Sequence, residues 1–258
     1  MKSGLVSITF RGLGVRAIVD LAREAGLQGI EWGGDVHAPH GDVAAAREAG
    51  ELTRAAGMEV AAYGSYYRLG PGTAAPRFED VLASALAMGA PMIRVWAGTK
   101  GSAETSEEEF AVVAADARRV ASMAKERGLR VGLEYHGGTL TDTDDSTRRL
   151  LNAAAHPALR SFWQPPVDMD KDGCLKSLET LVELGKLGSI HVFQWSPGWT
   201  RQDLETGAGR WKDYLKLALR AGGERFCCLE HVPNDDPAQA VKDAAVLNGW
   251  LKEITPSF

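Results

Sequence analysis

Residues 110–135 read FAVVAADARRVASMAKERGLRVGLEY and combine a helical pattern, a glycine and a short apolar run, in that order. From Phe110 onward, apolar residues recur at i, i+3, i+4 and i+7, which is the spacing of one face of a helix. Gly128 follows, where glycine tolerates the left-handed conformation that closes a last helical turn. The run RVGLEY comes next and has the length of a buried strand. The stretch therefore predicts one helix followed by one strand.

The same succession recurs along the chain, with glycine or proline marking where each helix stops. Helix start signals agree with it: Ser106 and Glu109 have the spacing of a capping box, and Asp236 offers an N-cap followed by Pro237. Counting the opening run LVSITF, we expect eight strands, each followed by a helix. The stop signals before the later strands are Gly26, Gly57, Gly89, Gly128, His156-Pro157, Gly188 and Gly222.

This alternation predicts the fold class. Repeated strand and helix units of roughly 30 residues imply parallel strands with right-handed crossovers. Eight such units close most naturally into a single α/β (β/α)8 TIM barrel, for which 258 residues are enough. The competing open, doubly wound sheet needs a glycine-rich phosphate loop after the first strand, and FRGLGV is too irregular for one. We therefore expect one barrel domain over residues 1–258.

The composition excludes several kinds of partner. A net charge of −5 argues against nucleic acid, and no apolar stretch approaches the roughly 18 residues that cross a membrane. The apolar run at the N-terminus is too short for a signal peptide. Cys227 and Cys228 are adjacent and point to opposite faces of a strand, so no disulfide framework is expected. We expect a cytoplasmic protein that acts on a small molecule, and since barrels of this size commonly pair, homo-oligomer formation stays open.

Four polar residues end four successive predicted strands, at the end of a barrel where active sites lie. A carboxylate or imidazole at the end of an apolar strand is costly to bury unless something binds it. Two carboxylates, an imidazole and an amide oxygen, with no thiolate, suit one divalent metal ion, Mn²⁺ first, with Mg²⁺, Co²⁺ or Zn²⁺ as alternatives. The alternative for the first of them is an ion pair with an arginine across the barrel mouth. The expected metal ligands are Glu134, Gln164, His191 and Glu230.

Other polar and aromatic residues at strand ends, or in the loops that follow, are expected to contact substrate. Flat indole rings suit the apolar face of a sugar, although buried tryptophan is also ordinary core filling. Arg11 and Arg94 either bind substrate or neutralise carboxylates inside the barrel, and His136 either shuttles a proton or faces solvent. The expected substrate contacts are Arg11, Glu31, Trp32, His37, His40, Tyr63, Trp96 and Trp195.

With these residues in view, the chain resembles the xylose-isomerase-like barrel superfamily, which includes sugar phosphate isomerases and epimerases, ketose 3-epimerases and inosose dehydratases. The likeness lies in LAREAGLQGIEW (21–32), in Glu-x-His at the fifth strand, in a histidine at the seventh and in Leu-Glu at the eighth. The resemblance implies one divalent metal held by Glu134, Gln164, His191 and Glu230, with Glu134 and Glu230 also moving protons.

This chain departs from the family pattern in three places. Gln164 stands where an aspartate is expected, which removes one negative charge from the ligand set. Val167 stands where epimerases often carry a histidine, and the seventh strand reads HVFQ in place of the common His-x-Lys-Asp. The resemblance therefore implies the fold and a metal site more firmly than any one reaction.

The resemblance implies proton abstraction beside a carbonyl, with Glu134, Glu230 and His136 as the candidate catalytic residues. We expect an isomerase or epimerase of a keto-sugar or related polyol. The alternatives are a lyase or dehydratase of a keto-sugar, which shares the same intermediate, and a non-catalytic sugar-binding subunit. A DNA-repair endonuclease of the same fold needs more metal ligands and a basic surface, which this chain lacks.

Overall fold

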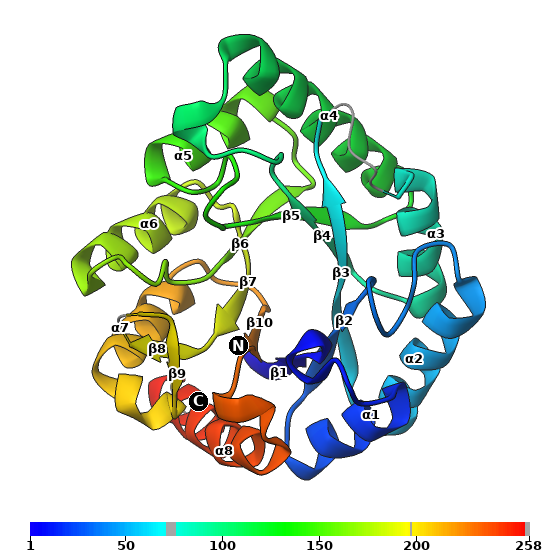
Figure 1. Ribbon diagram of the computed structural model, residues 1–258, viewed down its shortest axis with the longest axis vertical. Helices are drawn as coiled ribbons and strands as arrows, with labels where there is room; N and C mark the ends of the chain where they lie inside the picture. The colour runs from blue at the N-terminus through cyan, green and yellow to red at the C-terminus, as the bar shows by residue number, and fades with distance from the viewer. Residues whose placement is uncertain (71–75, 197, 256–258) are drawn as a thin grey trace.

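A computed structural model describes residues 1–70, 76–196 and 198–255. Its parallel strands form a closed eight-stranded barrel in the order β1-β10-β7-β6-β5-β4-β3-β2, which confirms the expected (β/α)8 fold (Figure 1). Each strand pairs with the strand of the next repeat, so that all carboxyl ends meet at one mouth. The strands are β1 (Lys2–Val6), β2 (Gly29–Gly33), β3 (Glu59–Arg68), β4 (Met92–Trp96), β5 (Arg130–Glu134), β6 (Leu159–Trp163), β7 (Leu187–Val192) and β10 (Phe226–Leu229).

Helices surround the barrel as an outer ring (Figure 1). They are α1 (Val15–Glu24), α2 (Val43–Ala55), α3 (Phe78–Met88), α4 (Glu107–Glu126), α5 (Asp144–Ala154), α6 (Lys171–Glu183), α7 (Ala208–Leu219) and α8 (Pro237–Ile254). Short 3-10 turns cover Ser7–Phe10, Ser102–Glu104, Leu204–Gly207 and Pro233–Asp235. After β7, an antiparallel hairpin of β8 (Gln194–Ser196) and β9 (Thr200–Gln202) forms a separate two-stranded sheet. None of the helices in the described part of the chain is long and apolar enough to cross a membrane.

The local signals explain most helix ends. Ser106 and Glu109 form the reciprocal capping box of α4, and Asp236 caps α8 ahead of Pro237. The stop glycines at 26, 57, 89, 128 and 222 all have positive φ. Gly188 is the exception, because it lies inside β7 while Gly185, at φ 62°, takes the left-handed position after α6.

Two strands differ from their expected lengths. The run LVSITF is extended only as far as Val6, and its second half is a 3-10 turn over Ser7–Phe10. Strand β3 runs on to Arg68, and its pairing with β4 shifts register between Gly64 and Tyr67. Both departures lie at the barrel mouth, where they change which side chains face inward.

The barrel interior is apolar toward the amino ends of the strands and charged toward their carboxyl ends. Met92, Phe162 and Phe226 fill the lower interior and are buried. Gly132 makes room for this layer, since a Cβ there would overlap the Phe162 ring. Charged side chains lie above it, on residues nearer the carboxyl ends of the strands.

The packing of α2 on α3 depends on Gly50 in the middle of α2. A Cβ at this position would overlap the carbonyl oxygen of Met88 at the end of α3. We expect Gly50→Ala to destabilise the protein by about 1–3 kcal/mol in urea unfolding, although alanine is the better helix former. Gly249→Ala on α8 is the matched control, because no atom lies within 4 Å of its added Cβ, and it should stabilise by up to ~1 kcal/mol. Equal effects at the two positions would contradict this account.

Candidate active site

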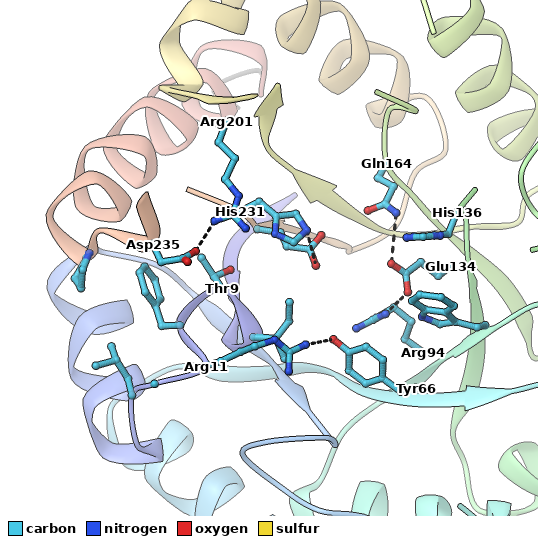
Figure 2. A pocket seen from close by; sticks show the side chains of 17 residues that line it. Thr9, Arg11, Tyr66, Arg94, Glu134, His136, Gln164, Arg201, His231 and Asp235 are labelled. Atoms are coloured by element: carbon cyan, nitrogen blue, oxygen red, sulfur yellow. Dashed lines mark hydrogen bonds and ion pairs between the residues drawn. The ribbon is translucent and has the colours of Figure 1, made fainter. Parts of the chain in front are cut away.

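The carboxyl ends of the strands open into a cavity of about 580 Å³ (Figure 2). Six of the residues expected from the sequence line it: Arg11, Trp96, Glu134, His136, Gln164 and Glu230. Residues that the sequence analysis did not select also line it, among them Thr9, Tyr66, Arg201, His231 and Asp235. His191 and Glu31 lie directly beneath, wholly buried. Charged residues therefore line the cavity, and its base is a buried ionic network of Glu31, Arg94, Glu134, His191 and Glu230, which is called the ionic floor below.

Arg94 is the centre of that floor. Its Nε lies 2.6 Å from Oε1 of Glu31, and its Nη1 pairs with Oε2 of Glu134. The arginine is only 1% exposed, and burial of a guanidinium without carboxylate partners would be very costly. Gly64 on β3 leaves room for the pair, since a Cβ there would press on both Arg94 and Glu31. The ion pair considered for Glu134 is thus present.

A second set of contacts continues from Glu31 across the barrel. Its Oε2 lies 2.9 Å from Nε2 of His191, whose Nδ1 lies 3.3 Å from Oε2 of Glu230. His231 approaches the other oxygen of Glu230, at 3.5 Å from Nε2. Five strands thus contribute to one line of charges, from Glu134 on β5 to Glu230 just after β10.

These contacts determine the protonation states beneath the cavity. Burial alone would lower the pKa of His191, but the charges of Glu31 and Glu230 outweigh burial and raise it to about 10. Burial would raise the pKa of Glu31, and the charges of His191 and Arg94 hold it below its ordinary value. Burial opposes ionisation of Glu230 as well, but the neighbouring histidines keep its pKa well below the usual range. Without a bound metal ion, these contacts favour carboxylates at Glu31 and Glu230 and an imidazolium at His191.

His136 reaches the cavity from the segment after β5. Its ring stacks on Trp96 with 4.5 Å between centroids, and the guanidinium of Arg68 lies over the same indole at 4.0 Å. Its Nδ1 lies 2.6 Å from the carbonyl oxygen of Gly137, so Nδ1 donates and Nε2 of the neutral ring keeps its lone pair. His136 is thus held in the tautomer that can accept a proton at Nε2.

Gln164 follows β6 and faces Glu134. Its Nε2 lies 3.4 Å from Oε1 of that carboxylate, the oxygen that Arg94 does not pair with. Glu134 is therefore approached from two sides, by a guanidinium on one oxygen and an amide on the other.

Six of the eight residues expected to contact substrate do not line this cavity: Glu31 is buried beneath it, Trp195 lines an adjoining one, and Trp32, His37, His40 and Tyr63 make contacts elsewhere in the protein. Side chains alternate along a strand, so Trp32 points away from the interior that Glu31 faces and donates from Nε1 to Thr53 on α2 at 3.0 Å. Tyr63 pairs with Trp32 across the sheet and also points outward, where its hydroxyl donates to the Ala38 carbonyl at 2.7 Å.

The two histidines of the loop after β2 are held by the protein itself. A ring nitrogen of His37 lies 3.0 Å from Ser7 Oγ and the other lies 3.1 Å from the Leu13 carbonyl. His40 bonds the Ser65 carbonyl. The loop therefore packs its histidines against the barrel wall. Trp195 lines an adjoining cavity instead, together with His136 and Gln164.

Tyr66 takes the place at the cavity that the sequence analysis gave to Tyr63. The register shift in β3 leaves Tyr66 at φ 55°, and its ring lies 5.2 Å from the Arg94 guanidinium carbon. Its hydroxyl accepts a hydrogen bond from Nη2 of Arg11 at 3.1 Å (Figure 2). The three consecutive polar residues SYY gave no signal of a bulge, so alternation alone selected the wrong tyrosine.

His231 also escaped the sequence analysis, because an extended chain would turn it away from Glu230. In the structure His231 has φ 60°, and this left-handed turn brings its ring back over the carboxylate. Burial lowers the pKa of His231. Arg201 and Asp235, 2.5 Å apart, close the same side of the cavity (Figure 2).

Three of the four expected metal ligands, Glu134, Gln164 and Glu230, line the cavity, and His191 is buried beneath it; all four are in contact with other protein side chains. Among the residues that the structure describes, no three histidine, cysteine, aspartate or glutamate side chains converge as a metal site. The donor set nevertheless suits a divalent cation in kind, and Nδ1 of His191, which is buried 3.3 Å from Oε2 of Glu230, makes no well-aligned hydrogen bond in the described chain. If the His191 imidazole is neutral, the carboxylates of Glu31, Glu134 and Glu230 face the single guanidinium of Arg94, which leaves two negative charges unbalanced. In kind and in charge, the residues fit a divalent cation.

A family model described as Xylose isomerase-like TIM barrel matches residues 19–253. A curated relative, the 3-dehydroshikimate dehydratase of Bacillus anthracis, is 40% identical over 68 residues, which are 26% of this chain and 24% of that protein. The match thus spans about a quarter of the relative's length.

Solved structures give the same picture of the fold. The probable 3-DHS dehydratase AsbF of Bacillus anthracis, involved in petrobactin synthesis, has a TM-score of 0.80 at 22% identity, over 96% of this chain and 99% of that one. An L-ribulose 3-epimerase scores 0.71 at 16% identity, over 98% and 95%. A xylose isomerase-like TIM barrel protein of Mycobacterium smegmatis in complex with magnesium scores 0.73 at 12% identity, over 98% and 97%. Because the sequence identities are this low, the three matches show that the fold is shared and nothing about the reaction.

The ionic floor makes a direct prediction about stability. Arg94→Met would leave Glu31 and Glu134 buried without their common cation, so we expect a loss of about 3–5 kcal/mol in urea unfolding. Arg23→Met is the matched control, since Arg23 pairs with Asp20 at 3.3 Å on the open surface and should change stability by at most ~1 kcal/mol. A loss at Arg94 no larger than at Arg23 would show that the floor does not depend on the guanidinium.

Proposed function

The chain belongs to the xylose isomerase-like TIM barrel family, and we propose that it is an enzyme that abstracts a proton beside the carbonyl of a keto-sugar or related polyol. In the first instance we propose isomerisation or epimerisation. The observation that carries the proposal is the pair Glu134 and Glu230, which reach one cavity from opposite ends of a buried line of charges. Glu134 can take a proton beside a carbonyl bound between the two, while Glu230 places a fixed negative charge on the other wall.

Glu134 and His136 are the better candidates for the base. Glu134 has one oxygen facing only the amide of Gln164, and His136 holds its Nε2 lone pair free. The lowered pKa of Glu230 makes it a weaker proton acceptor. Its charge, fixed by His191 and His231, would instead favour positive charge that develops near it.

Arg94 contributes to the same step from below. It lies between Glu31 and Glu134 and lines the cavity. An oxygen that gains negative charge as the proton leaves would lie close to its fixed positive charge. Because the Arg94 guanidinium is already in place, no charged side chain has to move to stabilise an enolate.

We also propose that Glu134, Gln164, His191 and Glu230 hold one divalent cation, Mn²⁺ in the first instance. When bound, such an ion would supply Lewis-acid polarisation of the substrate carbonyl. Its binding would require the His191 imidazole to be neutral, because a metal ligand must be deprotonated.

Dehydration is the second candidate, and the similarity to the 3-dehydroshikimate dehydratase favours it. The first step is the same, and loss of a β-hydroxyl group then replaces the return of the proton. The carbonyl compound, the base and the cavity are shared by both outcomes, so the product distinguishes them.

Proton exchange with solvent tests the reaction. In D₂O with Mn²⁺, we expect a panel of keto-sugars and cyclic polyol ketones to include one that takes up deuterium beside its carbonyl, followed by NMR. Deuterium without loss of a group identifies an isomerase or epimerase, and release of water identifies a dehydratase. Glu134→Gln and His136→Gln should slow exchange about 10²–10⁴-fold. Glu59→Gln, on an exposed glutamate at the opposite end of β3, is the control and should not. Exchange that survives both variants would contradict the assignment of the base.

Metal content tests the ligand set separately. We expect calorimetry on EDTA-treated protein to show one Mn²⁺ site, with Glu230→Gln weakening it at least ~10-fold and Glu59→Gln leaving it unchanged. Circular dichroism would confirm that each variant is folded. Absence of saturable Mn²⁺, Mg²⁺, Co²⁺ or Zn²⁺ binding by the unmodified protein would overturn the ligand proposal and leave the proton-transfer proposal to stand on exchange alone.

A further inference from the structure

A second cavity, of about 630 Å³, adjoins the first. The two share three lining residues, His136, Gln164 and His231, so they meet along one boundary. The second cavity lies between the segment after β6, which begins Pro165-Pro166, and the chain around the β8–β9 hairpin. A molecule bound over the carboxylates of the first cavity and long enough to pass His136, Gln164 and His231 would reach the second.

The linings of the two cavities differ in chemistry. Six charged residues line the first, Arg11, Arg94, Arg201, Glu134, Glu230 and Asp235, together with apolar and aromatic ones such as Ile8, Phe10, Leu13 and Trp96. Beyond the shared residues, the second is lined largely by aromatic and apolar side chains, including Phe193, Trp195, Trp199, Met169, Val167 and Pro166. Its carboxylates are Asp142 and Asp168. A ligand that occupies both cavities must therefore be polar at one end and apolar at the other.

Two indoles form a corner in the second cavity. Trp195 and Trp199 lie 5.3 Å apart at 87°, so one offers a face where the other offers an edge. Trp199 is 61% exposed and held at φ 61°. An exposed, strained tryptophan beside a cavity is unfavourable in the free protein, and an apolar group bound there would cover it. In addition, Nε1 of Trp195 is buried and has no hydrogen-bond partner among the described residues.

We propose that the substrate carries a planar apolar substituent, such as an aryl group joined through an ether oxygen, and that this substituent binds between Trp195 and Trp199. The proposal rests on the proposed function, because it places the reacting polyhydroxy ring over Glu134 and Glu230. The Trp195 N–H supplies a donor for the linking oxygen. The second cavity is thus an aglycone subsite, and the enzyme acts on substituted rings in preference to free sugars.

A second sugar ring is the competing occupant, because indoles also stack on sugars. Such a ring brings several hydroxyl groups, each of which needs a hydrogen-bond partner when it is buried. The lining beyond the shared boundary offers two carboxylates, the Tyr135 hydroxyl and the Trp195 N–H, and is otherwise mainly carbon surface, which is too few partners for the hydroxyl groups of a whole ring. The planar apolar group is therefore the better match.

Calorimetric titration with matched probes tests the subsite without any turnover. The probes are phenyl and methyl β-D-glucopyranoside, the corresponding galactosides and xylosides, and cellobiose. We expect the phenyl member of at least one pair to bind ~10-fold tighter than the methyl member, because only phenyl covers the indole corner. Equal affinities, no binding of any phenyl member, or tighter binding of cellobiose would overturn the proposal.

Substitutions of Trp199 test whether the phenyl preference arises in the second cavity. Trp199→Ala should reduce the phenyl advantage to less than about threefold and leave the methyl glycoside affinity unchanged, and Trp199→Phe should keep most of the advantage. Leu86→Ala is the control, since Leu86 is a large exposed apolar residue on α3, away from both cavities. A phenyl advantage that survives Trp199→Ala would refute the subsite. Binding needs no proton transfer, so the two tests are independent. A phenyl preference without deuterium exchange would contradict only the proposed reaction. Deuterium exchange without a phenyl preference would contradict only the proposed subsite.

Discussion

The bridge from Glu31 through Arg94 to Glu134 is the contact on which the barrel mouth depends. It joins β2, β4 and β5, and through His191 the same charges reach β7 and the end of β10. A buried network of this kind stabilises weakly as a whole, yet the loss of one member leaves its partners charged in a medium that does not solvate them. The charges that hold the strand ends together are therefore also the charges presented to a ligand, and neither role can change independently.

The binding region divides its tasks between two neighbouring spaces. Charged groups above the ionic floor suit a small polyhydroxy carbonyl compound, which agrees with membership of the xylose isomerase-like TIM barrel family. The adjoining apolar space contains neither Glu134 nor Glu230 and meets the first at His136, Gln164 and His231. Under the proposed function, chemistry and selection between substrates would fall largely to different side chains, with His136 at the boundary of both.

Local sequence signals predicted the fold because each depends on only a few residues that are neighbours in the sequence and needs no knowledge of the folded barrel. The capping pair Ser106 and Glu109 fixes a helix start without help from the rest of the chain. Strand ends predicted Glu134 and Glu230 for the same reason. Tyr66 was not predictable in this way, because its entry into the cavity depends on a register shift between β3 and β4, which two strands produce together. The pairing of Arg94 with carboxylates on its two sides likewise exists only once the barrel has closed.

The hairpin β8–β9 pairs only with itself and takes no part in the ring of strand hydrogen bonds that closes the barrel. It carries Arg201 to the charged cavity and Trp195 to the apolar one. A change in its length or sequence alters both walls and leaves the barrel ladder intact. The hairpin is thus the part of the cavity walls that can be exchanged with the least effect on the barrel, so that a different ligand could be accommodated here while the buried charges beneath stay unaltered.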